Sequence, residues 1–170
     1  LGSSGHANRI NASAVAEGQG IHVHEQKEET ASGGVGSVLK LTVHTGERTE
    51  QHSMTLSGTV LHGKFPRLLA CDGIDIEAPL NGTLLFIRNQ DVPGVIGRIG
   101  TLLGEHGINI ANFALGRAEL NNGAQPANGK RDALAVVLID PLKENSQIQK
   151  ALEAVSALPA IRDVKLVKLK

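Results

Sequence analysis

The chain has 170 residues and a mass of 17.8 kDa, which is enough for one ordinary domain or two small ones. Seventeen basic residues balance seventeen acidic residues, and there are only three Phe and no Trp or Tyr, so both duplex and single-stranded nucleic acid are unexpected partners. Every apolar run is too short to span a membrane, so no membrane partner is expected either.

The start of the chain and its one cysteine indicate the setting of the protein. Residues 1–7 are interpreted as a flexible tail, partly of vector origin, and no basic segment followed by an apolar one marks a signal peptide. Cys71 has no second cysteine to pair with, which fits a reducing compartment. We therefore expect a cytoplasmic protein.

Residues 8–80 predict a small, mostly β region of α+β type. A short helix is expected over 11–17 with Asn11 as its cap, and the alternation over 21–25 indicates an extended segment before a loop over 28–36. Further strands are predicted at 37–45, 49–62, 67–71 and 74–77.

Two turns organise these strands. The first, at 46–48, joins strands 37–45 and 49–62 into an antiparallel hairpin, and the second is Asp72-Gly73, the strongest short hairpin signal in the chain. Because few helical residues are left to cover a sheet face, the region is interpreted as part of a domain. Turn chemistry over 78–82 places its boundary there.

Residues 83–170 have the rhythm of a second domain. The predicted order is strand, helix, strand, strand, helix, strand, over 83–88, 93–105, 108–115, 133–140, 145–158 and 161–169, with a polar loop at 118–131. This βαββαβ order is the ferredoxin-like arrangement of an α+β fold. Both helices must cover one sheet face, so the other face is expected to stay open unless a partner covers it.

Two features of the first region resemble functional motifs but lack an essential residue. Residues 58–64 match most of a Walker A loop, but Phe65 replaces the Ser or Thr that binds magnesium, so a strand end and a turn are expected. His22 and His24 share a predicted strand face, but the sequence supplies no third metal ligand. No G-x-G-x-x-G or catalytic group stands out, so no metal site, cofactor or catalytic residue is expected in this chain.

The most informative stretch joins the strand at 83–88 to the helix at 93–105. Asp91 is placed to cap the exposed N–H groups at the helix start, where Pro93 lies in the first turn and Gly94 leaves the backbone open to a ligand. Those N–H groups suit a carboxylate, and Asp91 suits an ammonium group. Asn109 opens the second strand with a donor and an acceptor. The set describes either a small α-amino-acid site or a cap and a turn residue only.

These residues carry a resemblance. Residues 84–117, with Asp91 to Gly94 in a D-x-P-G pattern and Gly107 to Ile110 in a G-[VI]-N-I pattern, resemble an ACT domain, more closely that of bacterial long-form D-3-phosphoglycerate dehydrogenase. Residues 57–79 and 8–26 resemble the intervening domain of that enzyme family. The resemblance implies a regulatory region of a longer, NAD-dependent enzyme whose catalytic domains lie outside this chain.

The resemblance also implies a ligand and a site. The ACT domain of the family binds L-serine between two ACT domains, which implies a homo-oligomer, at least a dimer. The corresponding positions here are Asn89, Asp91, Pro93, Gly94, Val95 and Asn109, and Asn89 departs from the His or Tyr that relatives often carry. Arg67 matches one residue of an anion site in the intervening domain, but Pro79 and Leu138 stand where relatives can have Arg.

Two alternatives stay open. One is a purely structural dimerisation module without a ligand. The other is the regulatory region of L-serine dehydratase, which shares both domain types, although the Asp72-Gly73 strand pair running into an ACT domain favours the dehydrogenase.

Overall fold

The computed structural model describes residues 8, 10–27, 37–46, 52–119, 131–141 and 145–169, and it divides into two compact units, 1–33 and 34–170. The first unit holds one short helix, α1 (Ala12–Gly18), close to the predicted bounds. Its cap position is Asn11, as predicted, but the Asn11 side chain makes no capping bond to the helix. The predicted tail at 1–7 and loop at 28–36 lie outside the described residues.

The segment after α1 differs from its prediction. Residues 21–27 are irregular and form no strand with any described segment, so the strand face expected for His22 and His24 does not exist. Alternation over five residues was a weak signal, because a strand also needs a neighbour to satisfy its backbone. No group of three His, Cys, Asp or Glu that could hold a metal ion occurs among the described residues.

The second unit begins with an antiparallel four-stranded sheet in chain order. Its strands are β1 (Val38–Thr45), β2 (His52–Leu61), β3 (Phe65–Cys71) and β4 (Ile74–Pro79). The turn between β3 and β4 has positive φ at Asp72 and Gly73, as a tight hairpin turn requires, so that prediction is confirmed. The Walker-like residues end β2 and turn into β3 instead of starting a helix, also as predicted.

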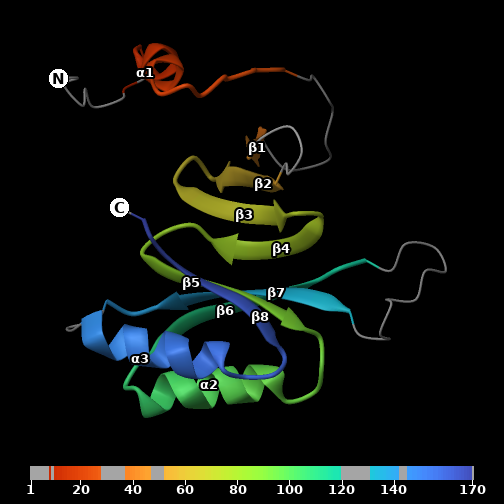
Figure 1. The fold of residues 1–170 in the computed structure, drawn as a ribbon, viewed down its shortest axis with the longest axis vertical. Helices are drawn as coiled ribbons and strands as arrows, with labels where there is room; N and C mark the ends of the chain where they lie inside the picture. Colours follow the sequence, from red (N-terminus) through yellow and green to blue (C-terminus); the bar gives the residue numbers. More distant parts are fainter. Residues whose placement is uncertain are drawn as a thin grey trace. The chain divides into compact units, whose positions relative to one another are not determined.

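A second sheet follows with two helices. Its strands are β5 (Thr83–Gln90), β6 (Ile110–Arg117), β7 (Asp132–Ile139) and β8 (Ile161–Lys168), in the order β6-β7-β5-β8 and with all neighbours antiparallel; the helices are α2 (Val95–Glu105) and α3 (Asn145–Ser156). This is the predicted ferredoxin-like βαββαβ fold (Figure 1). The helix predicted from Pro93 begins two residues later, at Val95.

The two helices cover one face of the second sheet (Figure 1). Every third or fourth residue of α2 is buried there, and α3 contributes a matching stripe to the same core. None of the described helices is long and apolar enough to cross a membrane. The core between helices and sheet includes Val95, Ile99 and Leu103 of α2, Ile148, Ala151 and Val155 of α3, and Leu85, Ile87, Ala135 and Val137 of the sheet.

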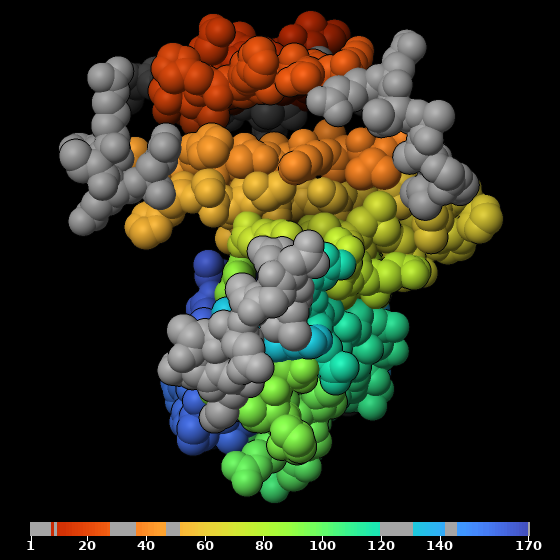
Figure 2. Space-filling view, turned by 90° about the vertical axis from the view of Figure 1, so that its right-hand side faces the viewer, coloured from red at the N-terminus to blue at the C-terminus, as the bar shows by residue number. Residues whose placement is uncertain are grey.

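The other face of this sheet is not open, which corrects the sequence-based expectation. The first sheet packs against it, and Figure 2 shows the yellow-green atoms of β4 against the teal atoms of β6. The shared core joins residues of β3 and β4 to residues of β5 and β7: Leu68, Cys71, Ile74, Ile76 and Ala78 with Leu84, Leu134 and Val136. One chain therefore supplies both layers that the second sheet needs.

One glycine marks where this packing is tightest, and it is not in α2. A Cβ at Gly97, Gly100 or Gly104 of α2 would meet nothing within 4 Å, so these glycines do not bring the helix closer to the sheet. At Gly116 of β6, a Cβ would overlap the backbone oxygen of Asp75 and lie 2.8 Å from the Ile74 side chain. The close approach is between β4 and β6.

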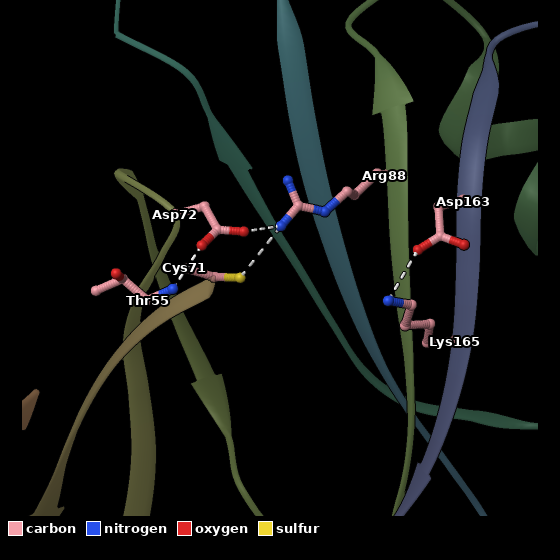
Figure 3. Close-up of polar contacts among 6 residues, drawn as sticks. All are labelled: Thr55, Cys71, Asp72, Arg88, Asp163 and Lys165. Atoms are coloured by element: carbon pink, nitrogen blue, oxygen red, sulfur yellow. Dashed lines mark hydrogen bonds and ion pairs between the residues drawn. The ribbon is translucent and has the colours of Figure 1, made fainter. Parts of the chain in front are cut away.

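A polar cluster joins the β3–β4 turn to the second sheet (Figure 3). The guanidinium of Arg88, on β5, pairs with the Asp72 carboxylate and lies 3.8 Å from Sγ of Cys71. The other Asp72 oxygen accepts the backbone N–H of Thr55 at 2.6 Å. Burial raises the pKa of the buried Cys71 thiol, and the charge of Asp72 adds to that rise while Arg88 opposes it. Asp72 thus holds together β2, the turn and β5.

Candidate functional site

The predicted site lies where β5 ends and α2 begins. Asn89 is 1% exposed and lies on the helix-facing side of β5. Its Nδ2 donates to the backbone oxygen of Gln90 at 2.8 Å, while its buried Oδ1 has no hydrogen-bond partner among the described residues. A buried acceptor without a donor costs free energy, and such groups are rare in folded proteins. Asn89 therefore offers an unused acceptor beside the helix start.

Asp91 is held in place by both its backbone and its side chain. Its N–H donates to the carbonyl of Arg131 at 2.8 Å, and its Oδ2 lies 3.0 Å from Nε of Arg117, at the end of β6. The Asp91 side chain is 24% exposed, whereas Arg117 is 59% exposed. The predicted capping role is wrong, because α2 has no side-chain cap and Asp91 pairs with Arg117 instead.

The start of α2 is formed by backbone alone. Gly94 occupies the cap position with φ 85, a left-handed conformation that favours glycine, and a Cβ there would meet nothing within 4 Å. The N–H of Val95 makes only a long contact, 3.4 Å, to the carbonyl of Val92. The first N–H groups of a helix have no carbonyl one turn earlier to bind, so this uncovered end can accept a carboxylate.

Asn109 lies at the opposite end of the sheet from Asp91 in the same chain. Ile110 and Thr83 both pair with Ile139, whereas Asn89 and Arg117 both pair with Ala133. The Asn109 amide donates to Oδ2 of Asp140 at 2.7 Å. The expectation that Asn109 stands beside the same end as Asp91 is therefore wrong within one chain, because β5 and β6 run in the same direction and Asn109 precedes the second of them.

A cavity of about 260 Å³ lies beside this loop, between the start of α2 and the turn that precedes β8. Pro93 and Val95, both predicted site residues, are part of its wall, and its volume is slightly below the range of about 300–1,000 Å³ typical of drug-sized ligands. Such a volume suits a small molecule, and Asn89 and Asp91 are not among the residues that line it. The lining residues are Gln90, Val92, Pro93, Val95, Arg98, Leu158, Pro159 and Ala160.

The other predicted ligand residue, Arg67, lies apart in β3. It pairs in register with Thr59 on one side and with Pro79 on the other, and its Nε is buried without a partner among the described residues. No second basic side chain occupies either of those register positions. An anion site there stays a prediction.

Arg117 is not among the site residues predicted from the sequence. A Gly-Arg pair at a predicted strand end has no distinctive pattern, because the strand register that brings Arg117 opposite Ala133, and so near Asp91, is a long-range property. The pairing of β6 with β7 is the information that was lacking.

Two protein families match most of the chain. Residues 83–160 match the ACT domain, and residues 3–72 match the D-3-phosphoglycerate dehydrogenase intervening domain. Among curated relatives, D-3-phosphoglycerate dehydrogenase of Synechocystis is 34% identical over 95% of this chain, and that of Bacillus subtilis is 30% identical over 95%. D-3-phosphoglycerate dehydrogenase 2, chloroplastic, of Arabidopsis thaliana is 25% identical over 98%.

The chain spans only about a quarter of these relatives, 26% of the Synechocystis protein and 27% of the Bacillus protein. The resemblance inferred from residues 8–26, 57–79 and 84–117 is confirmed by the two matches. The chain therefore belongs to the family of D-3-phosphoglycerate dehydrogenase regulatory regions, in which an intervening domain precedes an ACT domain.

Proposed function

We propose that this chain is the effector-binding and assembly region of a D-3-phosphoglycerate dehydrogenase, and that it binds L-serine or a similar small α-amino acid. The observation that carries the proposal is the uncovered start of α2, with the Asp91 carboxylate and the unused Asn89 acceptor beside it. An α-amino acid carries an ammonium group for Asp91 and a carboxylate for the backbone N–H groups near Gly94 and Val95.

The proposed assembly uses the edge strand β6, because pairing there brings Asn109 of a second copy into reach of the site. Among the described strands, β6 pairs only with β7, so its outer edge is available to a second copy. Two β6 strands that pair antiparallel about a two-fold axis put the start of one beside the end of the other. The partner subunit's Asn109 then comes to the end of β6 where Arg117 and Asp91 lie.

The proposed regulation follows from this arrangement. An effector that contacts both subunits stabilises the paired ACT domains. It changes the activity of the parent enzyme only if its affinity differs between two arrangements of the catalytic domains. We propose that those domains bind NAD and D-3-phosphoglycerate, that no cofactor binds in this region, and that the parent enzyme works in the cytoplasm, where a lone cysteine stays reduced.

Calorimetric titration of the chain with L-serine tests the proposal. We expect saturable binding with one site per ACT domain, and weaker binding of D-serine, which cannot present the same groups in the same directions. No heat of binding with L-serine, glycine, L-alanine or L-threonine contradicts the effector role. A stable dimer that binds none of them supports the purely structural alternative.

Substitutions rank the site residues. Asp91→Ala removes a charged partner and should weaken binding about 30- to 150-fold, while Asn109→Ala removes neutral bonds and should weaken it about 5- to 30-fold. Asn89→Ala should weaken binding about as much as Asn109→Ala, because the buried Oδ1 of Asn89 has no hydrogen-bond partner among the described residues. Far-ultraviolet circular dichroism checks that each variant is folded. Unchanged affinity in both the Asp91 and Asn109 variants contradicts this site.

A further inference from the structure

Arg117 holds the Asp91 carboxylate in a way that leaves most of the guanidinium available. The contact is made by Nε, so the ion pair does not require the two terminal nitrogens of Arg117. The side chain is 59% exposed and extends from the last residue of β6. A guanidinium binds a carboxylate best through two parallel N–H groups, so a free edge of this kind is a ready carboxylate receptor.

Asp91 meets Arg117 through one of its two oxygens. Oδ2 makes the contact, which leaves Oδ1 as a second acceptor on a side chain that is three-quarters buried. An acceptor oxygen and a donor fork therefore lie side by side at one end of the sheet, with opposite charge. An α-amino acid carries an ammonium group and a carboxylate on one carbon. The ammonium group is complementary in charge to Asp91, and the carboxylate is complementary to Arg117.

We propose that the Asp91–Arg117 pair recognises the zwitterion of the ligand: Oδ1 of Asp91 accepts a hydrogen bond from the ammonium group, and the terminal N–H groups of Arg117 donate to the carboxylate, which has acceptor sites left for the backbone N–H groups near Gly94 and Val95. This rests on the proposed function and adds a specificity-determining residue to it. The ion pair stays intact on binding, because Nε and Oδ2 keep their contact. The site then selects molecules that have both a free ammonium group and a free carboxylate. The Asp91–Arg117 pair does not recognise the side chain of the amino acid.

The pair also lies at the edge through which we propose assembly. Arg117 is the last residue of β6, so a β6–β6 pairing places the two zwitterion sites of a dimer near the two ends of the joint. Arg117 then binds the ligand's carboxylate while the partner subunit's Asn109 contacts the same ligand. The ligand therefore bridges the two subunits.

Titration of the full chain with L-serine and with L-serinamide, which keeps the ammonium but lacks the carboxylate, tests the role of Arg117. Arg117→Gln should weaken L-serine binding about 10- to 100-fold, because a charge-assisted double hydrogen bond is lost. The same variant should leave the weak binding of L-serinamide within about twofold of wild type. Arg117→Lys should recover only part of the loss, since Lys has no planar fork.

Arg162→Gln is the matched control. Arg162 pairs with Asp132 at 2.8 Å at the same end of the sheet and is 53% exposed, so the variant removes the same charge without touching Asp91. It should change L-serine affinity by less than about twofold. Equal losses for L-serine and L-serinamide in Arg117→Gln, or an unchanged or increased L-serine affinity, overturn the proposal for Arg117 while the effector site stands. A wild-type chain that binds no amino acid overturns both.

Discussion

Gly116 shows how a single residue determines whether two layers can meet. It lies in β6 where β4 crosses closest, and its missing side chain leaves room for the backbone oxygen of Asp75 and for Ile74 and Ile76. The buried faces of β3, β4, β5 and β7 depend on this distance. Its backbone conformation is ordinary, so the requirement for glycine here is one of space and not of φ.

We therefore expect Gly116→Ala to lower the free energy of unfolding by about 1–3 kcal/mol, as overpacking of a core does. Urea unfolding followed by circular dichroism measures the change. A variant as stable as wild type would mean that β4 and β6 separate easily, and the shared core would then contribute little.

Cys71 provides a pH-dependent test at the same scale. Its pKa is raised above the usual 9.0, chiefly by burial and next by Asp72. The folded chain thus keeps the thiol proton to higher pH than the unfolded chain does, and this stabilisation is complete below the unfolded pKa. It is lost as pH rises through the folded pKa. The chain contains no Tyr that would titrate in the same range.

The free energy of unfolding should therefore decrease as the pH rises above the ordinary pKa of a cysteine thiol. Chemical unfolding at a series of pH values measures the slope, and Cys71→Ala should have a smaller slope even though its absolute stability is lower. Equal slopes in the two proteins would show that Cys71 is not the group responsible.

At the scale of elements, α2 has two differently built ends. Its C-terminus is closed by a Schellman pattern, in which Ile108 donates to the carbonyl of Leu103 and Gly107, with φ 68, donates to that of Gly104. Its N-terminus is left to backbone groups at Gly94 without a side-chain cap. The helix is therefore held by its buried stripe and its C-terminus, and its first N–H groups receive no side-chain cap.

The glycines on the outer side of α2 cost stability without a packing benefit in the chain. Gly97→Ala and Gly100→Ala should each raise the free energy of unfolding by up to about 1 kcal/mol, because alanine restricts the unfolded chain and fits the open space. Gly107→Ala is the matched control and should lower it by about 1–2 kcal/mol, since φ there is positive. Thermal or urea unfolding measures the free energy of unfolding of each variant. A destabilised Gly97→Ala would mean that the outer face of α2 is in contact with another copy.

At the scale of the whole molecule, the first sheet takes the place of a partner on the second sheet. The apolar face opposite the helices needs no second copy, because β3 and β4 cover it. The edge strands of this sheet are β6 and β8, and the assembly that we propose uses β6. The zwitterion site lies at the end of the β6 edge.

We predict dimers in solution through β6. Sedimentation velocity over a concentration series should show a dimer. Asn112→Lys, at an exposed position of β6, should weaken the dimer, because the new charges of the two copies approach each other across the two-fold axis. Leu169→Lys, next to the β8 edge, is the control and should leave the dimer intact. A monodisperse monomer at high concentration contradicts assembly by this route.

The sequence by itself determined the local structure of this protein. Apolar periodicity located the strands and helices of the βαββαβ unit, turn chemistry located the hairpin at Asp72-Gly73, and the residues of the β5–α2 loop marked the candidate site. These features depend on residues close in the chain, where backbone preference and side-chain spacing decide the outcome.

Only the tertiary structure decided which surfaces and side chains meet. Strand order and register decide which layer covers the second sheet and why Gly116 must be glycine while Gly97 need not be. They also decide that Asp91 pairs with Arg117 instead of capping α2. The same register puts Asn109 at the far end of the sheet from Asp91. Such contacts join residues far apart in sequence, and their energies arise from packing that no short pattern of residues records.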